Sequence, residues 1–286
     1  MRTIGENLSV QVNDITVAYS DLGPETAPPV IFIHGFPFNR KMWDLQLEAL
    51  KNNYRVIAYD IRGHGNTTAG IKDFSIETFS EDFTGFMEKL NLTEVIGCGL
   101  SMGGYILLAT AKKSPTLFRG LLLASTQCMP DSPEAKNKRT KAISSIQKQG
   151  IEAYADESIK KLFSSKSFTA RKGEVRSIRE MICTTSVDTL CKTLKALAER
   201  KETCSDLHEL TIPVLVMAGE EDAIIAPDAS EFLAEQFSNS FFEVISSSGH
   251  LSNLENTHEF NGKLKKYLEM IYTPKESRGV ARQHLY

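Results

Sequence analysis

The chain has 286 residues, of which 41% are hydrophobic and 24% charged, as in an ordinary folded domain. Its formal charge of −3 gives no basic excess, which argues against a nucleic-acid partner. Because no apolar run approaches the roughly 18 residues that span a membrane, and the start MRTIGENLSVQVND has no apolar signal core, we expect a cytoplasmic protein with no membrane partner.

Short β-rich apolar runs alternate with amphipathic segments of helix length, which predicts an α/β protein with a mostly parallel sheet and helices on both faces. The expected strands are residues 9–13, 15–20, 30–35, 55–60, 94–99, 120–126, 213–219 and 241–246. The expected helices are residues 40–51, 75–90, 102–113, 227–237 and 255–271. A turn at Asn13-Asp14 between the first two strands predicts an antiparallel start.

The strand pattern disappears between residues 127 and 211, where apolar residues recur at helical spacing. We therefore predict a helical cap, or lid, inserted at 127–211 into a core made of residues 1–126 and 212–286. The polar tail beyond Pro274 is expected to be poorly ordered unless it docks.

The five cysteines, at positions 98, 128, 183, 191 and 204, are odd in number and form no C-x-x-C pair. This pattern argues against a disulfide framework and against a zinc site. We expect reduced thiols that mostly fill the core, and neither a metal nor a cofactor.

Residues 99–103, Gly-Leu-Ser-Met-Gly, match G-x-S-x-G between a strand-like and a helix-like segment, the context that this motif requires. Such a sharp turn needs neighbours without bulky side chains, and it aims the Ser101 hydroxyl outward. Two nucleotide-binding interpretations fail: Met102 stands where G-x-G-x-x-G needs its third glycine, and no Gly-Lys-Ser/Thr is present. We therefore predict that Ser101 is a nucleophile.

A serine nucleophile needs an imidazole base, which a carboxylate in turn orients. His250 is our candidate base because it follows the last expected strand, at the same sheet edge as Ser101. His34 and His64 occupy glycine-containing loops, where hydrogen bonds that brace the loop are the simpler expectation. The other histidines, at 208, 258 and 284, are expected at the surface.

The candidate orienting acid is Asp222, which follows the strand ending at Gly219. Glu220 and Glu221 remain alternatives at this stage, whereas Asp228 lies in the first turn of a helix after Pro227. The chain order Ser101, Asp222, His250 is the order of such a triad in the strand-turn-helix context.

Two backbone amides are expected to stabilise the oxyanion. One is that of Met102, at the start of the helix after the nucleophile. The second is that of Phe36 in the loop after the third strand, since Gly35 lets this loop turn sharply and Pro37 has no N–H. The single tryptophan, Trp43, is expected to pack against the sheet.

Together these residues resemble the α/β-hydrolase family over nearly the whole chain up to about residue 271. The matching stretches are His34-Gly35-Phe36-Pro37, residues 60–65, residues 99–104, residues 219–222 and Gly249-His250. The resemblance implies an eight-stranded sheet with a helical cap after the sixth strand, and it assigns Ser101, His250, Asp222 and the amides of Phe36 and Met102 the roles given above. Thr67 departs from the serine of many relatives, a mild change.

Within the family, residues 189–222 and 249–260 are similar to small esterases and 3-oxoadipate enol-lactonases. We therefore predict a cofactor-free serine hydrolase of small esters or lactones. The alternatives are a carbon–carbon bond hydrolase of dienoate or diketone substrates, or a ligand receptor or regulatory protein that keeps the hydrolase fold. Dehalogenases and epoxide hydrolases of the family use Asp where Ser101 stands, which argues against both.

Overall fold

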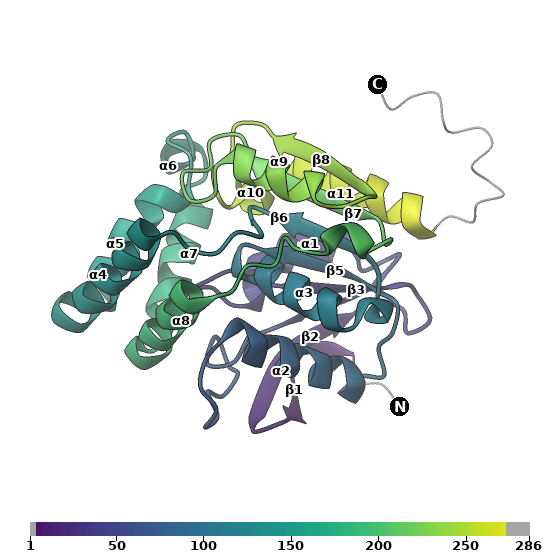
Figure 1. The fold of residues 1–286 in the computed structure, drawn as a ribbon, viewed down its shortest axis with the longest axis horizontal. Helices are drawn as coiled ribbons and strands as arrows, with labels where there is room; N and C mark the ends of the chain where they lie inside the picture. The colour runs from purple at the N-terminus through teal and green to yellow at the C-terminus, as the bar shows by residue number, and fades with distance from the viewer. Residues whose placement is uncertain (1–3, 273–286) are drawn as a thin grey trace.

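The computed structural model describes residues 4–272. Its eight strands form one sheet in the order β1-β2-β4-β3-β5-β6-β7-β8 (Figure 1). The strands are β1 (Gly5–Val12), β2 (Ile15–Leu22), β3 (Pro29–Ile33), β4 (Arg55–Tyr59), β5 (Val95–Leu100), β6 (Phe118–Ala124), β7 (Val214–Gly219) and β8 (Ser240–Ile245). All eight predicted strands are confirmed, with ends that differ by a few residues.

The sheet is antiparallel at one edge and parallel elsewhere. β2 pairs in antiparallel fashion with both β1 and β4, and all pairs from β4 to β8 are parallel. Asn13, with φ 49°, makes the predicted turn between β1 and β2. Because parallel strands end at a common edge, the loops after β3, β5, β7 and β8 lie along one rim of the sheet.

Helices cover both faces of the sheet, and strand residues alternate between the two cores. Ile31 and Ile33 face the core built with α2 (Ile76–Lys89), α3 (Met102–Lys113) and α9 (Pro227–Glu235). Val30 and Phe32 face the core that includes α1 (Asp44–Leu50) and α11 (Thr257–Tyr272). This alternation follows from the two-residue period of a strand.

One predicted helix is divided: the segment 40–51 begins as the 3₁₀ turn η1 (Arg40–Trp43) and continues as α1. The predicted helix 255–271 is α11, and the short α10 (Ser252–Glu255), which was not predicted, precedes it. Trp43 is fully buried and packs against Phe32 and Phe260, which confirms the predicted packing role.

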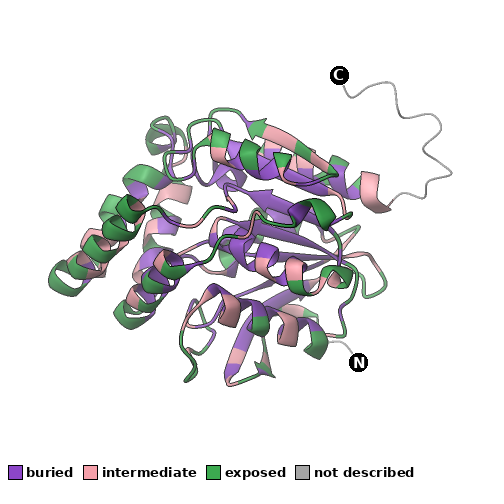
Figure 2. Cartoon of the chain, in the orientation of Figure 1, coloured by how far each residue is buried: buried purple, intermediate pink, exposed green. Residues whose placement is uncertain are grey.

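Between β6 and β7 the chain is helical, as predicted for this stretch. Its helices are α4 (Pro133–Gln149), α5 (Ile151–Leu162), α6 (Ser167–Ala170), α7 (Lys172–Cys183) and α8 (Val187–Glu199). Figure 1 shows α4, α5, α7 and α8 gathered beside the sheet. The outer helix α4 is largely exposed, whereas the inner strands β3 to β7 are mostly buried (Figure 2).

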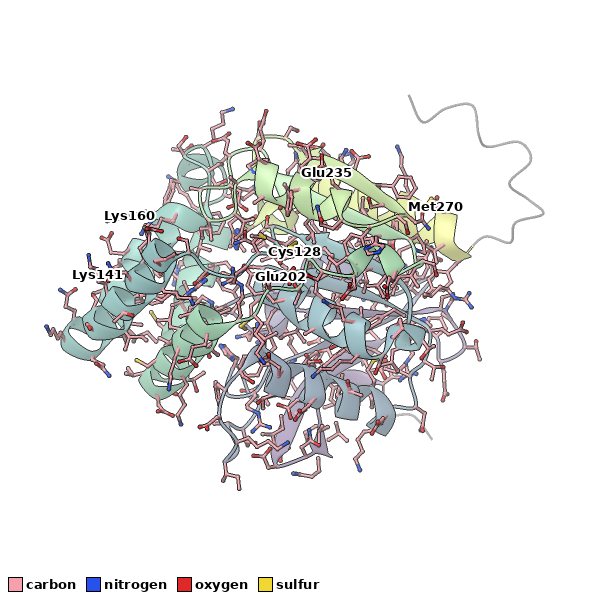
Figure 3. All side chains as sticks on the ribbon, in the orientation of Figure 1. Cys128, Lys141, Lys160, Glu202, Glu235 and Met270 are labelled. Atoms are coloured by element: carbon pink, nitrogen blue, oxygen red, sulfur yellow. A yellow bond between two sulfur atoms is a disulfide. The ribbon has the colours of Figure 1, made fainter. Side chains whose placement is uncertain are left out.

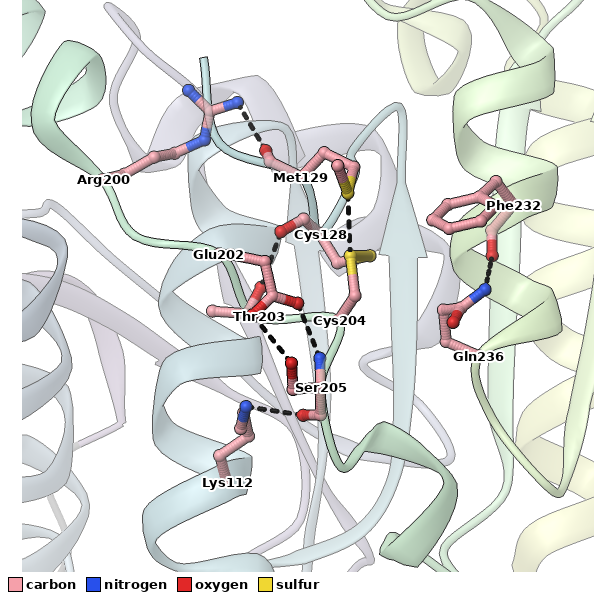
Figure 4. Close-up of a disulfide and its surroundings, with 10 residues drawn as sticks. All are labelled: Lys112, Cys128, Met129, Arg200, Glu202, Thr203, Cys204, Ser205, Phe232 and Gln236. Carbon is pink, nitrogen blue, oxygen red and sulfur yellow. Dashed lines mark hydrogen bonds between the residues drawn. A yellow bond between two sulfur atoms is a disulfide. The ribbon is translucent and has the colours of Figure 1, made fainter. Parts of the chain in front are cut away.

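The prediction of five reduced cysteines was wrong for two of them. Cys128 and Cys204, 76 residues apart in sequence, form a disulfide with a Cα–Cα distance of 4.9 Å (Figures 3 and 4). A backbone hydrogen bond lies beside the disulfide, since the N–H of Thr203, the residue before Cys204, donates to the Cys128 carbonyl at 2.9 Å. The pair thus joins the segment that leaves β6 to the one that returns toward β7. Cys98, Cys183 and Cys191 are free.

In the part of the chain that the structure describes, no helix is both long and apolar enough to cross a bilayer. The predicted disorder of the tail beyond Pro274, and the surface position of His284, concern residues outside this part.

Candidate active site

Ser101 occupies a strained turn between β5 and α3. Its backbone has φ 53° and ψ −112°, a combination that a non-glycine residue adopts only when its surroundings enforce it. The Ser101 N–H donates to the Ala124 carbonyl at 2.9 Å, and α3 begins at the next residue. Ser101 is partly exposed, although all residues of β5 are buried.

The glycines around Ser101 are required by close backbone contacts. A Cβ at Gly103 would lie 2.2 Å from the Ile33 carbonyl oxygen, and one at Gly99 would lie 2.5 Å from the carbonyl carbon of Gly103. Real Cβ atoms essentially never come this close to backbone atoms. Strand β5, helix α3 and the end of β3 therefore meet with no room for side chains at these positions.

Thr126, which the sequence reasoning missed, holds the same turn from the other side. It is fully buried after β6, and its Oγ1 donates to the Ser101 carbonyl at 2.9 Å. The Ser230 hydroxyl in turn donates to the Thr126 carbonyl at 3.0 Å. The signal available in the sequence was its position at the end of the strand that neighbours β5.

The structure brings Asp222 and His250 together. His250 Nδ1 lies 2.8 Å from Asp222 Oδ2, and both side chains are buried, with residue exposures of 1% and 6%. Glu220 and Glu221 are exposed, so Asp222 is the acid that contacts the imidazole. Asp228 lies in the first turn of α9, as predicted.

The environment of Asp222 keeps its carboxylate charged. Burial raises the pKa of this carboxyl, but the electrostatic interaction with His250, their hydrogen bond and the N–H groups of Ile225 and Ile224 outweigh burial. The pKa of Asp222 therefore lies below its usual value. Both isoleucine N–H groups donate to Oδ1, at 3.0 and 2.8 Å, which leaves Oδ2 for the imidazole.

The loops of the acid and of the histidine are packed against each other. A Cβ at Gly219 would lie 1.9 Å from the Gly249 carbonyl oxygen. Ser101 follows β5, which lies two strands from β7 in the sheet. Within residues 4–272, no hydrogen bond joins the Ser101 hydroxyl to His250. Hydrogen bonds between catalytic groups are often long without substrate and tighten in the complex.

The loop after β3 adjoins the Ser101 turn. A Cβ at Gly35 would lie 3.4 Å from the Ser101 Cβ, and the Phe38 N–H closes a turn on the Gly35 carbonyl at 3.0 Å. Within residues 4–272 the Phe36 N–H has no hydrogen-bond partner. Met102 is the first residue of α3, where an N–H has no partner within the helix.

Helices from the segment between β6 and β7 cover this loop. The Phe36 ring packs against an apolar cluster centred on Ile146, Leu190 and Leu194. The Thr185 hydroxyl donates to the Pro37 carbonyl at 3.3 Å. The loop after β3 is therefore fixed on one side by the sheet and on the other by these helices.

His34 and His64 are fully buried and brace their loops, as predicted. His34 Nε2 accepts from the Ile61 N–H at 2.9 Å while Nδ1 contacts the Gly35 carbonyl, and His64 Nδ1 contacts the Arg62 carbonyl at 3.0 Å. Burial lowers the pKa of His34 to about 4 and that of His64 to about 3. Both rings are therefore neutral near pH 7. His208 and His258 are exposed, as predicted.

The described residues 4–272 contain no group of three or more His, Cys, Asp or Glu side chains arranged to hold a metal ion. Along this rim of the sheet lie Ser101 in its strained turn and the His250–Asp222 pair. The N–H groups of Phe36 and Met102 belong to the loop and the helix that adjoin Ser101. A serine, a histidine–carboxylate pair and backbone N–H donors are the group types that serine acyl-transfer enzymes use.

The model of the alpha/beta hydrolase family matches residues 30–263. The chain belongs to this family. It is 28% identical over 256 residues to 3-oxoadipate enol-lactonase 1 of Acinetobacter baylyi, an alignment that covers 90% of this chain and 91% of the relative. It therefore lies in the group that resembles the enol-lactonases.

Solved structures agree with this placement. An esterase from Thermogutta terrifontis superposes with a TM-score of 0.88 at 32% identity, covering 93% of this chain and all of that one. The enol-lactonase of Burkholderia xenovorans gives a TM-score of 0.85 over 91% and 99% of the two chains, at 24% identity, and supports the fold. Family and relatives together indicate a hydrolase.

Proposed function

We propose that this hydrolase cleaves small esters or lactones through a covalent acyl-enzyme on Ser101. The 2.8 Å contact between His250 Nδ1 and Asp222 Oδ2, at the rim where Ser101 stands, is the observation that carries the proposal. A carboxylate at Nδ1 holds the imidazole in the tautomer with Nε2 unprotonated, which is what a base for serine requires. The named esterase and lactonase relatives support the same substrate class.

In the proposed reaction, His250 Nε2 takes the proton of the Ser101 hydroxyl while Oγ attacks the substrate carbonyl. The N–H groups of Phe36 and Met102 stabilise the charge on the carbonyl oxygen. When the tetrahedral intermediate collapses, the bond to the leaving oxygen breaks and His250 returns the proton to it. His250 then deprotonates a water that attacks the acyl-enzyme, releasing the acid and restoring Ser101.

We propose that residues 127–211 form a lid over this site, inserted into a core of 1–126 and 212–286. The apolar cluster around Phe36, with Ile146, Leu190 and Leu194, supports this role because it lies beside the proposed oxyanion loop. A lid of this kind excludes water and selects the substrate. Apolar lid residues favour a small apolar group on the ester or lactone.

A cytoplasmic location remains a prediction from the sequence. The Cys128–Cys204 disulfide instead favours an oxidising compartment, where such bonds persist. Alkylation of free thiols in freshly lysed cells, followed by mass measurement, distinguishes the two: five blocked thiols support the cytoplasm, and three support an oxidising location.

The proposed function is tested with a fluorophosphonate probe and p-nitrophenyl esters. Wild-type protein should be labelled once and should hydrolyse the ester, Ser101→Ala should do neither, and Ser144→Ala on the exposed face of α4 should behave as wild type. Hydrolysis of dienoates or diketones faster than esters would indicate a carbon–carbon hydrolase. A single turnover per molecule would indicate a receptor.

A further inference from the structure

Glu255 is a buried carboxylate that the proposed reaction does not use. It ends α10, five residues after His250, and is only 5% exposed. Burying a carboxylate is costly unless other groups satisfy it. Among the described residues no Lys, Arg or His forms an ion pair with it, so hydrogen-bond donors must do so.

The two carboxylate oxygens of Glu255 accept hydrogen bonds from two different segments of the chain. Oε1 accepts from the Gly249 N–H at 2.8 Å, in the loop that carries His250. Oε2 accepts from the Ser164 N–H at 2.8 Å and from the Ser167 hydroxyl at 2.7 Å, both in the segment between β6 and β7. One side chain therefore joins the histidine loop to residues 164–167, and hydrogen bonds to a carboxylate are stronger than neutral ones.

The backbone on either side of Gly249 makes the same connection. The His250 N–H donates to the Leu162 carbonyl at 3.0 Å. A Cβ at Gly249 would lie 2.8 Å from the Ser164 nitrogen, so the two backbones are in direct contact there. Arg171 Nε also donates to the Glu255 carbonyl at 3.1 Å. The backbone of His250 is thus held by residues 162–167 on one side, and Gly249 packs against Gly219 on the other.

We propose that Glu255 is a positioning residue for His250: it fixes the Gly249–His250 backbone against residues 162–167, so that the imidazole is aligned only while this helical segment is docked. The inference rests on the proposed function, in which His250 is the base. A displacement of about 1 Å in a reacting group can cost on the order of 100-fold in rate. Loosening this link therefore affects the chemical step more than substrate binding.

A Glu255→Gln variant tests the link with little change in volume. An amide has only one acceptor oxygen, so in either orientation the Gly249 N–H or the Ser164 N–H loses its partner. With a p-nitrophenyl ester we expect kcat to fall about 10- to 100-fold while KM changes less than about threefold. Ser167→Ala removes only the hydroxyl bonded to Oε2 and should give a smaller fall in kcat.

The matched control is Glu259→Gln. Glu259 also accepts from a backbone N–H near the histidine loop, that of Ser246 at 3.1 Å, but none of its bonds reaches residues 127–211. Its substitution should leave kcat near that of wild type. An equal fall of kcat in both variants would overturn the inference, because it would reflect general loosening of the loop.

Hydrogen exchange followed by mass spectrometry gives a readout that does not depend on activity. In Glu255→Gln, peptides covering 246–256 and 160–170 should exchange at least tenfold faster, while peptides from β5 and β6 keep their protection. Unchanged exchange, or unchanged kcat in a folded variant, would overturn the inference. Wild-type protein that neither hydrolyses the ester nor reacts with the fluorophosphonate would overturn the proposed function, and the exchange result would still decide whether Glu255 joins the two segments.

Discussion

Asp222 and His250 contact each other through one carboxylate oxygen, while the other is held by the protein backbone. Oδ2 lies 2.8 Å from His250 Nδ1, and Oδ1 accepts from the N–H groups of Ile224 and Ile225. The two oxygens therefore cannot exchange roles without breaking backbone hydrogen bonds. This asymmetry determines what a substitution at Asp222 does to the imidazole.

In Asp222→Asn the amide oxygen should take the place of Oδ1, because the two backbone N–H groups require an acceptor. The amide N–H then faces His250 Nδ1, which leaves the ring proton on Nε2 and blocks its action as a base. We expect kcat for ester hydrolysis to fall on the order of 10³- to 10⁴-fold with little loss of stability. Steady-state kinetics and thermal unfolding measure the two effects.

The control is Glu221→Gln, an exposed carboxylate one residue before Asp222. Its kcat should equal that of wild type. Comparable losses in the two variants, or an active Asp222→Asn, would contradict the proposed role of Asp222.

A second prediction concerns the space around the Ser101 turn. In Gly103→Ala the new Cβ would lie 2.2 Å from the Ile33 carbonyl oxygen, so the turn must shift. We expect a loss of about 1–3 kcal/mol in the free energy of unfolding and, in the folded fraction, a lower rate of labelling by the fluorophosphonate. Urea denaturation and labelling kinetics check both.

Gly262→Ala provides the comparison, because this glycine lies within α11 and a Cβ there meets nothing within 4 Å. Alanine is the better helix former by about 0.8–1.0 kcal/mol, so this variant should be more stable than wild type and react equally fast with the probe. A Gly103→Ala protein that behaves like Gly262→Ala would show that the turn tolerates a side chain.

The strands were predictable because their signals are local, and the proposed triad residues were chosen from the same local signals. A parallel strand is recognised in the sequence as a short apolar run. Ser101, Asp222 and His250 each follow such a run. Thr126 and Glu255 gave no comparable signal, since each acts through a contact with a residue 25 or 91 positions away. The Cys128–Cys204 pair was missed for the same reason, as spacing along the chain does not reveal distance in the fold.

A third prediction concerns acid stability. The pKa of His34 is about 4 and that of His64 about 3 in the folded protein, against about 6.5 in an unfolded chain. Below pH 6.5 the unfolded state therefore binds more protons than the folded state. The stability that depends on the neutral rings is complete above pH 6.5 and is lost as the pH falls toward 4 for His34 and 3 for His64, by about 1.4 kcal/mol per pH unit for each histidine.

Urea denaturation at several pH values between 7 and 5 measures this slope. His64→Phe removes one of the two groups, so its slope should be shallower by up to about 1.4 kcal/mol per pH unit, whatever its stability at pH 7. Identical slopes in wild type and His64→Phe would mean that His64 is not held neutral in the folded protein.

The final prediction concerns the disulfide that joins the two ends of the helical segment. Because 76 positions separate Cys128 from Cys204, the chain-entropy model gives about 4.5 kcal/mol of stabilisation from the restricted unfolded state. The double variant Cys128→Ser/Cys204→Ser should lose up to this amount in urea denaturation. Cys183→Ser, which removes a free thiol from the end of α7, should lose much less stability.

Thiol titration of denatured, unreduced wild-type protein should find three free cysteines, and a value of five would contradict the bond. The double variant should keep its esterase kcat at temperatures where it is folded, because the Glu255 contacts and the Thr185 bond to Pro37 attach the helical segment to the proposed site independently of the disulfide.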